Sequence, residues 1–270
     1  MRGHLFLVLC LNFVLLPSFL PGQTLKVSET QQQLSLPEIE QIVTALEVKQ
    51  KEIEKNLPDY TYTREILIQT IGQDGSSIES EYHRISEMTY DDKGTPIEKI
   101  LLFPKPRIRY HEYNINDKTL KELAQLQAVP VEAEKLRQHK FLYLGKENVL
   151  GREAYAFRLS PLVEPKDPKN PYFSGEIWVD CNDLQVIKAY GKGEPDTKKG
   201  KFPTETLTCV KVDDKYWFPA EQFTDQILEF KHPILGRLMG YKDGIIRLHT
   251  RQSLKFSEYK RFKTEMKILD

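Results

Sequence analysis

The first half of the chain is dominated by stretches in which apolar and polar residues alternate, the pattern of strands with one buried face. Over residues 60–71, one side carries Tyr60, Tyr62, Ile66 and Ile68, and the other carries Thr61, Thr63, Glu65 and Gln69. Turn residues at 72–75 and 91–96 separate this stretch from two more, at 78–90 and 97–103. The pattern predicts a three-stranded antiparallel meander.

Further strand signals follow in the second half. They begin at 141–144 and 153–159 and continue as an aromatic-rich run from Phe173 to Ile268, which turns interrupt at 182–183, 213–215 and 242–244. No segment repeats at a fixed period, so a solenoid or a propeller is not expected. We therefore predict a mainly β protein, in which residues 36–270 form a single domain built on one curved antiparallel sheet.

Two stretches have helical periodicity instead. In residues 37–56 most apolar positions recur at spacings of three and four, namely Ile39, Ile42, Val43, Leu46, Val48 and Ile53. Ser35 is suited to the N-cap, and Pro58 stops the helix. A second, short helix is predicted at 117–128 as an insertion in the sheet. We expect the first helix to lie against the concave side of the sheet, because its apolar stripe needs a partner.

The amino terminus has the three parts of a secretory signal peptide. Arg2 gives a basic start, an apolar run extends from Leu5 to Leu16, and helix-breaking residues follow up to Gly22. The run is well short of the roughly 20 residues that span a bilayer, so we expect cleavage of residues 1–22 and no transmembrane span afterwards. Cys10 lies inside the run without preceding small residues, which disfavours lipid attachment there. Residues 23–35 are polar and predict a linker.

The charge balance limits the classes of partner to expect, and the cysteine content bears on whether a disulfide forms. The chain has 39 basic and 39 acidic residues, which are interspersed, so we expect no nucleic-acid partner and no strongly cationic face for an anionic membrane. After cleavage Cys181 and Cys209 remain, and an even count in an oxidising compartment permits a disulfide between them. The bond needs close alignment of their strands, so two unbonded thiols are the alternative.

Motifs for catalysis are lacking in the sequence. The histidines at 83, 111, 139, 232 and 249 do not have the short spacings of a metal site, although Glu81, His83 and the His111–Glu112 pair form one across strands in an alternative interpretation. There is no Gly-x-Ser-x-Gly elbow, and neither cysteine has an electropositive setting. We therefore predict that the protein is not an enzyme and has no cofactor or metal.

Apolar capacity is what remains. Aromatic and aliphatic residues occupy one face of most predicted strands. A curved sheet lined in this way either encloses an elongated apolar ligand or is filled by its own side chains, and the sequence leaves both alternatives open.

Several strand motifs resemble those of the bacterial outer-membrane lipoprotein-sorting (LolA-like) superfamily. They are Gly175-Glu-Ile-Trp-Val-Asp180 with its continuation to Lys188, the Tyr-Trp-Phe-Pro run at 216–219, and Tyr259-Lys-Arg-Phe262. The resemblance covers most of the chain after residue 22 and is most specific from about residue 140 onward. It implies an incomplete antiparallel barrel wrapped around helices, with an apolar concave face that receives acyl chains. This chain is longer than the lipoprotein carrier and has an inserted helix and long charged loops.

From the resemblance we predict a periplasmic carrier or sensor, without catalysis, that binds lipid or a lipidated protein and associates with the outer membrane. The candidate lining residues of the concave face are Tyr60, Tyr62, Arg64, Ile66 and Ile68, with Arg64 in a position suggestive of a gating arginine. The main alternative is an envelope structural or interaction protein with a filled half-barrel and a protein partner. A weaker alternative is a hydrolase or metal enzyme that uses His83 and His111.

Overall fold

The computed structural model describes residues 33–102, 131–167, 170–196, 202–231, 233–238, 240 and 242–262. Contacts divide the chain into two units, residues 1–30 and 31–270, and everything described below belongs to the second. The predicted signal peptide, the predicted helix at 117–128, His111 and His232 lie outside the described residues.

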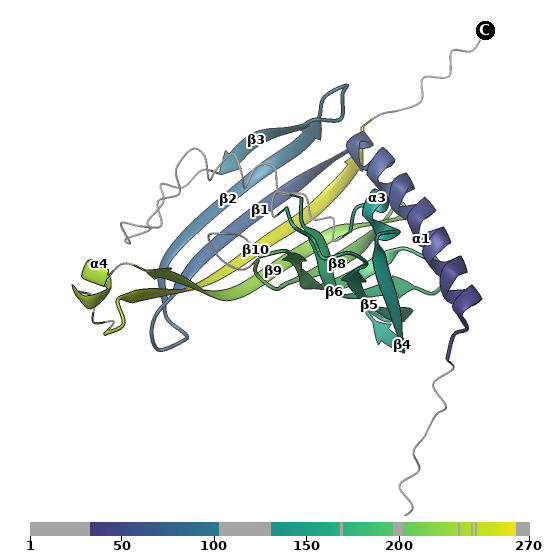
Figure 1. The fold of residues 1–270 in the computed structure, drawn as a ribbon. Coiled ribbons are helices and arrows are strands. Elements are labelled where there is room, and N and C mark those ends of the chain that lie inside the picture. Colours follow the sequence, from purple (N-terminus) through teal and green to yellow (C-terminus); the bar gives the residue numbers. More distant parts are fainter. Residues whose placement is uncertain are drawn as a thin grey trace, which may run out of the picture. The chain divides into compact units, whose positions relative to one another are not determined.

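The described chain is built on one ten-stranded antiparallel sheet (Figure 1). The strands are β1 (Tyr60–Ile71), β2 (Ile78–Tyr90), β3 (Pro96–Leu102), β4 (His139–Val149), β5 (Arg152–Pro161), β6 (Tyr172–Asp180), β7 (Val186–Glu194), β8 (Glu205–Val212), β9 (Tyr216–Lys231) and β10 (Ile245–Arg261). Their order is β3-β2-β1-β10-β9-β8-β7-β6-β5-β4, so the sheet is open, with β3 and β4 at its edges. The predicted mainly β fold and its first meander are confirmed.

One pairing joins strands that are far apart in the sequence. The last strand, β10, lies between β1 and β9, with Ile66 opposite Leu254 and Leu254 opposite Gln222. All other neighbours in the sheet are consecutive in the chain. The β1–β10 pair therefore holds the two meanders, β1–β3 and β4–β9, in one sheet.

The predicted amphipathic helix is α1 (Leu36–Asn56), which continues into a short 3₁₀ helix, η1 (Leu57–Asp59). Its N-terminus is capped at Ser35, whose backbone amide donates to the Glu38 carboxylate at 2.7 Å. Ile42, Val43, Leu46 and Ile53 are buried, as predicted, but Val48 is 60% exposed. Val48 is wrongly placed in the stripe because it lies two residues from Leu46, on another face of the helix.

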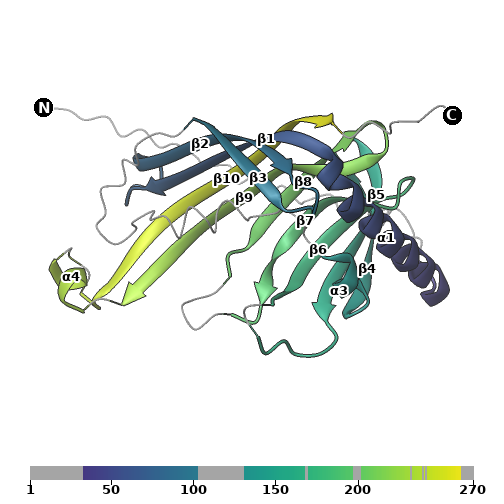
Figure 2. The same cartoon turned by 90° about the horizontal axis from the view of Figure 1, so that it is seen from above.

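Helix α1 packs on the inner face of the sheet, which we define as the face that carries the even-numbered residues of β1. Ile42, Leu46 and Ile53 of α1 belong to the same core cluster as Phe157, Ile177 and Phe218 from the sheet. Figures 1 and 2 place α1 beside the β4–β8 part of the sheet. The expected packing of helix against sheet is thus confirmed.

Hydrogen bonds and ion pairs join α1 to the short helix α3 (Ala133–Leu136) and to Arg137, the residue that follows α3. Arg137 donates to Glu47 at 2.7 Å and to the Thr44 hydroxyl at 2.9 Å, and it also pairs with Glu40. Farther along α1, the Glu54 carboxylate accepts the Ala133 amide at 2.8 Å. These contacts orient α1 across one end of the inner face.

Candidate ligand-binding face

The five residues predicted to line the concave face all lie on the inner face of β1, and all are buried. Their exposed fractions are 1% for Tyr60, 6% for Tyr62, 1% for Arg64, 0% for Ile66 and 3% for Ile68. Burial alternates along β1 as the sequence pattern predicts. The structure therefore gathers the predicted set on one face and closes it from solvent.

Tyr60 and Tyr62 belong to an aromatic cluster at the α1 end of this face. The Tyr60 ring lies 4.9 Å from that of Phe218, and the Tyr62 ring lies 5.3 Å from that of Tyr259. The Tyr60 hydroxyl donates to Asp213 at 2.6 Å. Burial, with this carboxylate, raises the pKa of Tyr60 to about 12. These two tyrosines are part of a filled core.

Beyond the aromatic cluster, strand register places residues in two rows that run across the inner face. One row is Arg84, Ile66, Leu254 and Gln222, from β2, β1, β10 and β9. The next row is Tyr82, Ile68, Gln252 and Thr224, from the same strands. Because neighbouring strands are about 4.8 Å apart, each row spans about 14 Å. The first row thus has polar groups at both ends and an aliphatic middle, whereas in the second row Ile68 lies between Tyr82 and Gln252.

A charged cluster lies at the β2–β3 end of these rows. Glu98 of β3 accepts hydrogen bonds from Arg64 at 2.9 Å and from the Ser86 hydroxyl at 2.7 Å, and it also pairs with Arg84. The side chains of Arg64 and Arg84 are 1% and 4% exposed, and that of Glu98 is 11% exposed. Two buried guanidinium groups share one carboxylate, which leaves an excess positive charge among these three side chains.

Three buried polar atoms on the rows have no hydrogen-bond partner among the residues that the structure describes: the Tyr82 hydroxyl, Arg84 Nε and Gln222 Oε1. Tyr82 and Arg84 are two residues apart on β2, so both side chains project from the same face. Buried polar groups in folded proteins are nearly always hydrogen-bonded, and an orphan group indicates a missing partner or a functional role. The rows are therefore the candidate site.

At the opposite end of the rows, the Gln222 amide donates to Glu205 of β8. Burial raises the pKa of the Glu205 carboxyl, although this hydrogen bond opposes the shift. The polar ends of the face thus differ in charge, with guanidinium groups on β1 and β2 and a single carboxyl on β8.

The side chains proposed for catalysis are placed elsewhere. His83 contacts Glu65 at 2.7 Å on the outer face of the sheet, and Glu81 accepts from Gln69 there. No group of three or more metal-binding side chains occurs in the described parts of the chain. Cys181 and Cys209 are free thiols, and burial raises the pKa of both, to about 12 for Cys209. Neither cysteine is poised as a thiolate nucleophile.

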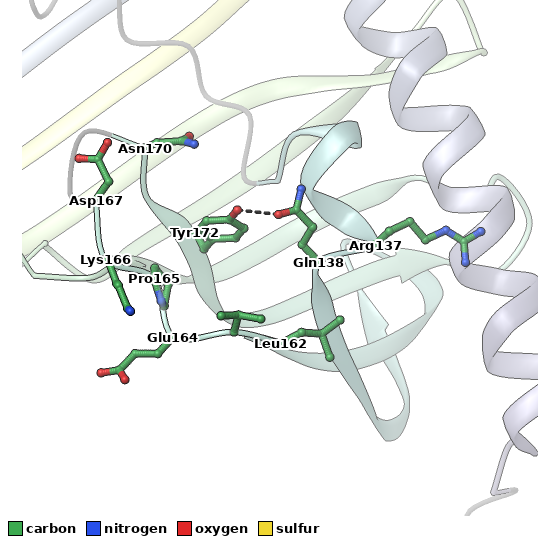
Figure 3. Close-up of a pocket in the computed structure, with 10 residues that line it drawn as sticks. Arg137, Gln138, Leu162, Glu164, Pro165, Lys166, Asp167, Asn170 and Tyr172 are labelled. Carbon is green, nitrogen blue, oxygen red and sulfur yellow. Dashed lines mark hydrogen bonds between the residues drawn. The ribbon is translucent and has the colours of Figure 1, made fainter.

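Two clefts lie outside the inner face. A cleft of about 460 Å³ lies between Arg137 and Gln138, which follow α3, and residues 162–167, 170 and 172. Figure 3 shows its lining residues, among which the Tyr172 hydroxyl donates to Gln138 at 2.6 Å. A second cleft of about 560 Å³ lies between the first turns of α1 and β4 and is lined mainly by aliphatic side chains and Phe141. Neither cleft contains any of the five predicted residues.

No protein-family model and no curated protein match this chain. Solved structures do match. A DUF1329 family protein from Desulfovibrio piger is 12% identical, with a TM-score of 0.36, over 84% of this chain and 94% of that one. A putative outer membrane lipoprotein-sorting protein domain from Vibrio parahaemolyticus is 12% identical, with a TM-score of 0.33, over 83% of this chain and 95% of that one.

A LolA superfamily protein from Nitrosomonas europaea is also 12% identical, with a TM-score of 0.30, and the match covers 86% of this chain and 96% of that one. Within the described residues, no helix is long and apolar enough to cross a membrane.

Five residues on which the site depends were missed in the sequence: Tyr82, Arg84, Glu98, Gln222 and Leu254. In the sequences of β2 and β3, apolar and polar residues alternate less cleanly than in β1, so the sequence alone does not show which of these side chains face inward. The available signal was the spacing of Tyr82, Arg84, Ser86 and Met88, which shares the two-residue period of the buried face.

Proposed function

We propose that this protein is a non-enzymatic carrier or sensor of the bacterial cell envelope, which binds lipid or a lipidated protein against the inner face of its sheet. The observation that carries the proposal is the set of orphan polar atoms around an aliphatic strip. Ile66, Ile68 and Leu254 supply the strip, and Tyr82, Arg84 and Gln222 supply the unpaired groups. A ligand with an apolar chain and a hydrogen-bonding head matches both features.

In this proposal the folded domain is residues 36–270, exported by the amino-terminal signal and located in the periplasm. Entry of a ligand requires the inner face to open, because Ile66 is fully buried. Binding would then offset the cost of the orphan groups by supplying their missing hydrogen bonds.

Replacement of Tyr82 by Phe tests the proposal, since it removes only the orphan hydroxyl. We expect affinity for a fluorescent fatty acid to fall about tenfold if the ligand bonds that hydroxyl. The free energy of unfolding should stay the same or rise, because a buried unpaired hydroxyl is unfavourable. Native mass spectrometry of the exported protein, purified from a membrane-containing lysate, should show retained lipid.

The matched control is Tyr60→Phe, which removes a hydroxyl that is bonded to Asp213. It should lower stability by about 1 kcal/mol and leave ligand affinity unchanged. Absence of retained lipid, with no probe binding by the parent, would contradict the proposal.

The second candidate is an envelope interaction protein with a filled half-barrel, and the 0% exposure of Ile66 favours it. Ile66→Asp separates the two candidates. In a filled core the buried charge should cause gross destabilisation, whereas in a face that opens for ligand the loss should fall mainly on binding. Thermal melting and probe binding, measured on the same samples, give the order of the two losses.

A further inference from the structure

The connection between β9 and β10 has an unusual composition. Residues 231–244, which we call the hairpin tip, include the short helix α4 (Pro233–Leu238). From residue 231 to residue 242 the sequence has three basic residues and no acidic one, together with Ile234, Leu235, Leu238, Met239 and Tyr241. The chain as a whole is electrically balanced, so this local excess is hidden in the overall composition.

Backbone packing on one side of α4 leaves Ile234 and Leu238 facing outward. Gly236 is buried, and a Cβ atom there would lie 2.6 Å from the carbonyl carbon of Gly244. Gly244 has a φ of +68°, and a Cβ atom there would lie 2.8 Å from Pro233 Cα. The inward side of α4 is thus a close backbone contact that only glycine permits.

Ile234 and Leu238 are four residues apart, so they share one side of α4. They are 81% and 82% exposed. Figures 1 and 2 show α4 at the free end of the β9–β10 hairpin, at the opposite end of the sheet from α1. Exposed large aliphatic side chains at a protruding end indicate an interaction site.

The charges beside these side chains indicate what the site contacts. Arg237 and Lys242 are exposed, and neither forms an ion pair with a residue that the structure describes. Asp243 is turned back to Arg247, at 2.8 Å. Exposed aliphatic side chains near cations that have no ion-pair partner among the described residues match the boundary of a bilayer, where acyl tails accept the aliphatic groups and anionic headgroups accept the cations.

We propose that the hairpin tip docks on an anionic lipid surface, with Ile234 and Leu238 inserted among the acyl chains and Arg237 and Lys242 at the headgroups. This surface is distinct from the inner face, so the proposal does not depend on what that face binds. A membrane contact at this end would leave the α1 end of the sheet free.

Flotation with vesicles tests the proposal, using the full protein purified after export. Vesicles of phosphatidylcholine alone are compared with vesicles that also contain phosphatidylglycerol. We expect binding to the anionic vesicles, and an affinity about tenfold or more weaker for the double variant Ile234→Asp with Leu238→Asp. The control is Leu142→Asp with Leu150→Asp, which alters two leucines that are 50% and 54% exposed on the β4–β5 hairpin. It should bind as the parent does.

A second double variant, Arg237→Gln with Lys242→Gln, tests the role of charge. It should bind neutral and anionic vesicles equally, and its binding should no longer depend on the salt concentration. The proposal would be overturned if the parent and the Ile234/Leu238 variant bound anionic vesicles equally well. It would also be overturned if the Leu142/Leu150 control lost as much affinity for the vesicles as the Ile234/Leu238 variant does. The proposal would also be overturned if the parent did not bind vesicles but self-associated, and the Ile234/Leu238 variant did not self-associate. That result would indicate that the hairpin tip contacts a second copy of the protein. Tyr82→Phe should leave vesicle binding intact, so failure here is separable from failure at the inner face.

Discussion

Some residues of the inner face form buried ion pairs in addition to packing in the core. Glu98 is the one described carboxylate bonded to both Arg64 and Arg84, and all three side chains are largely shielded from water. A buried ion pair contributes little net stability, because desolvation opposes the attraction, but loss of one member leaves an uncompensated charge. Such a cluster therefore adds little to the free energy of unfolding, but it strongly favours one arrangement of β1, β2 and β3 over others.

Asp180 shows how a residue of the superfamily-like motif acts on structure. It ends β6, is fully buried, and accepts hydrogen bonds from Arg152 at 2.8 Å and from the amides of Asn182 and Asp183 at 2.9 and 2.8 Å. Burial alone would raise the pKa of Asp180, but these bonds outweigh it and hold the pKa below 3.8. The motif residue thus closes the turn between β6 and β7.

We predict a pH-dependent loss of stability from Asp180→Asn. Because the folded pKa is depressed, the ionised carboxylate stabilises the fold above the ordinary pKa of 3.8, and this stabilisation is lost as the pH falls through the lower folded pKa. At pH 7 the variant should be less stable by about 2–4 kcal/mol, and the difference should shrink below pH 4. Urea unfolding at several pH values measures it.

The control is Asp196→Asn, which alters an exposed partner of Lys192 at 3.3 Å. Its effect at pH 7 should stay within about 0.5 kcal/mol. A difference between parent and Asp180→Asn that does not change with pH would contradict the assignment.

Helices and strands with a regular pattern of apolar residues were predictable from the sequence, but the strands that pair with one another in the sheet were not. The strand at 60–71 and the helix at 37–56 agree with β1 and α1 because alternation and helical spacing are local properties. The pairing of β1 with β10 joins Ile66 to Leu254, which no local pattern encodes. Arg84 and Glu98 entered the site through register: the irregularity at Thr70/Ile71 shifts the β1–β2 pairing that sets Arg84 opposite Ile66, and the β2–β3 pairing sets Glu98 opposite Met88.

Helix α1 should contribute to stability through its buried side only. Leu46 is 1% exposed in the core cluster, so Leu46→Ala should cost about 2–5 kcal/mol through lost burial and a residual cavity. Val48→Ala, at a 60% exposed position, should change stability by less than about 0.5 kcal/mol. Urea denaturation of the two variants gives the comparison. Similar costs at both positions would mean that α1 is held in another way.

At the scale of the molecule, one core cluster includes α1 and every strand except β3. We therefore predict that the folded domain unfolds in a single transition. Tryptophan emission, from Trp178 in β6 and Trp217 in β9, reports on the α1 side, and far-ultraviolet circular dichroism reports on all strands. The two urea curves should coincide. An early dichroism change with unaltered emission would instead show that the β1–β3 end melts separately.

The position of β10 between β1 and β9 has a consequence for the order of assembly. A chain that is synthesised from its amino terminus presents β1 to β9 before β10 exists. Until then, the edges of β1 and β9 that will pair with β10 have no partner, and the two meanders have no strand in common. The sheet forms only when the last strand arrives, so a nascent chain must be shielded from edge-to-edge association until synthesis is nearly complete.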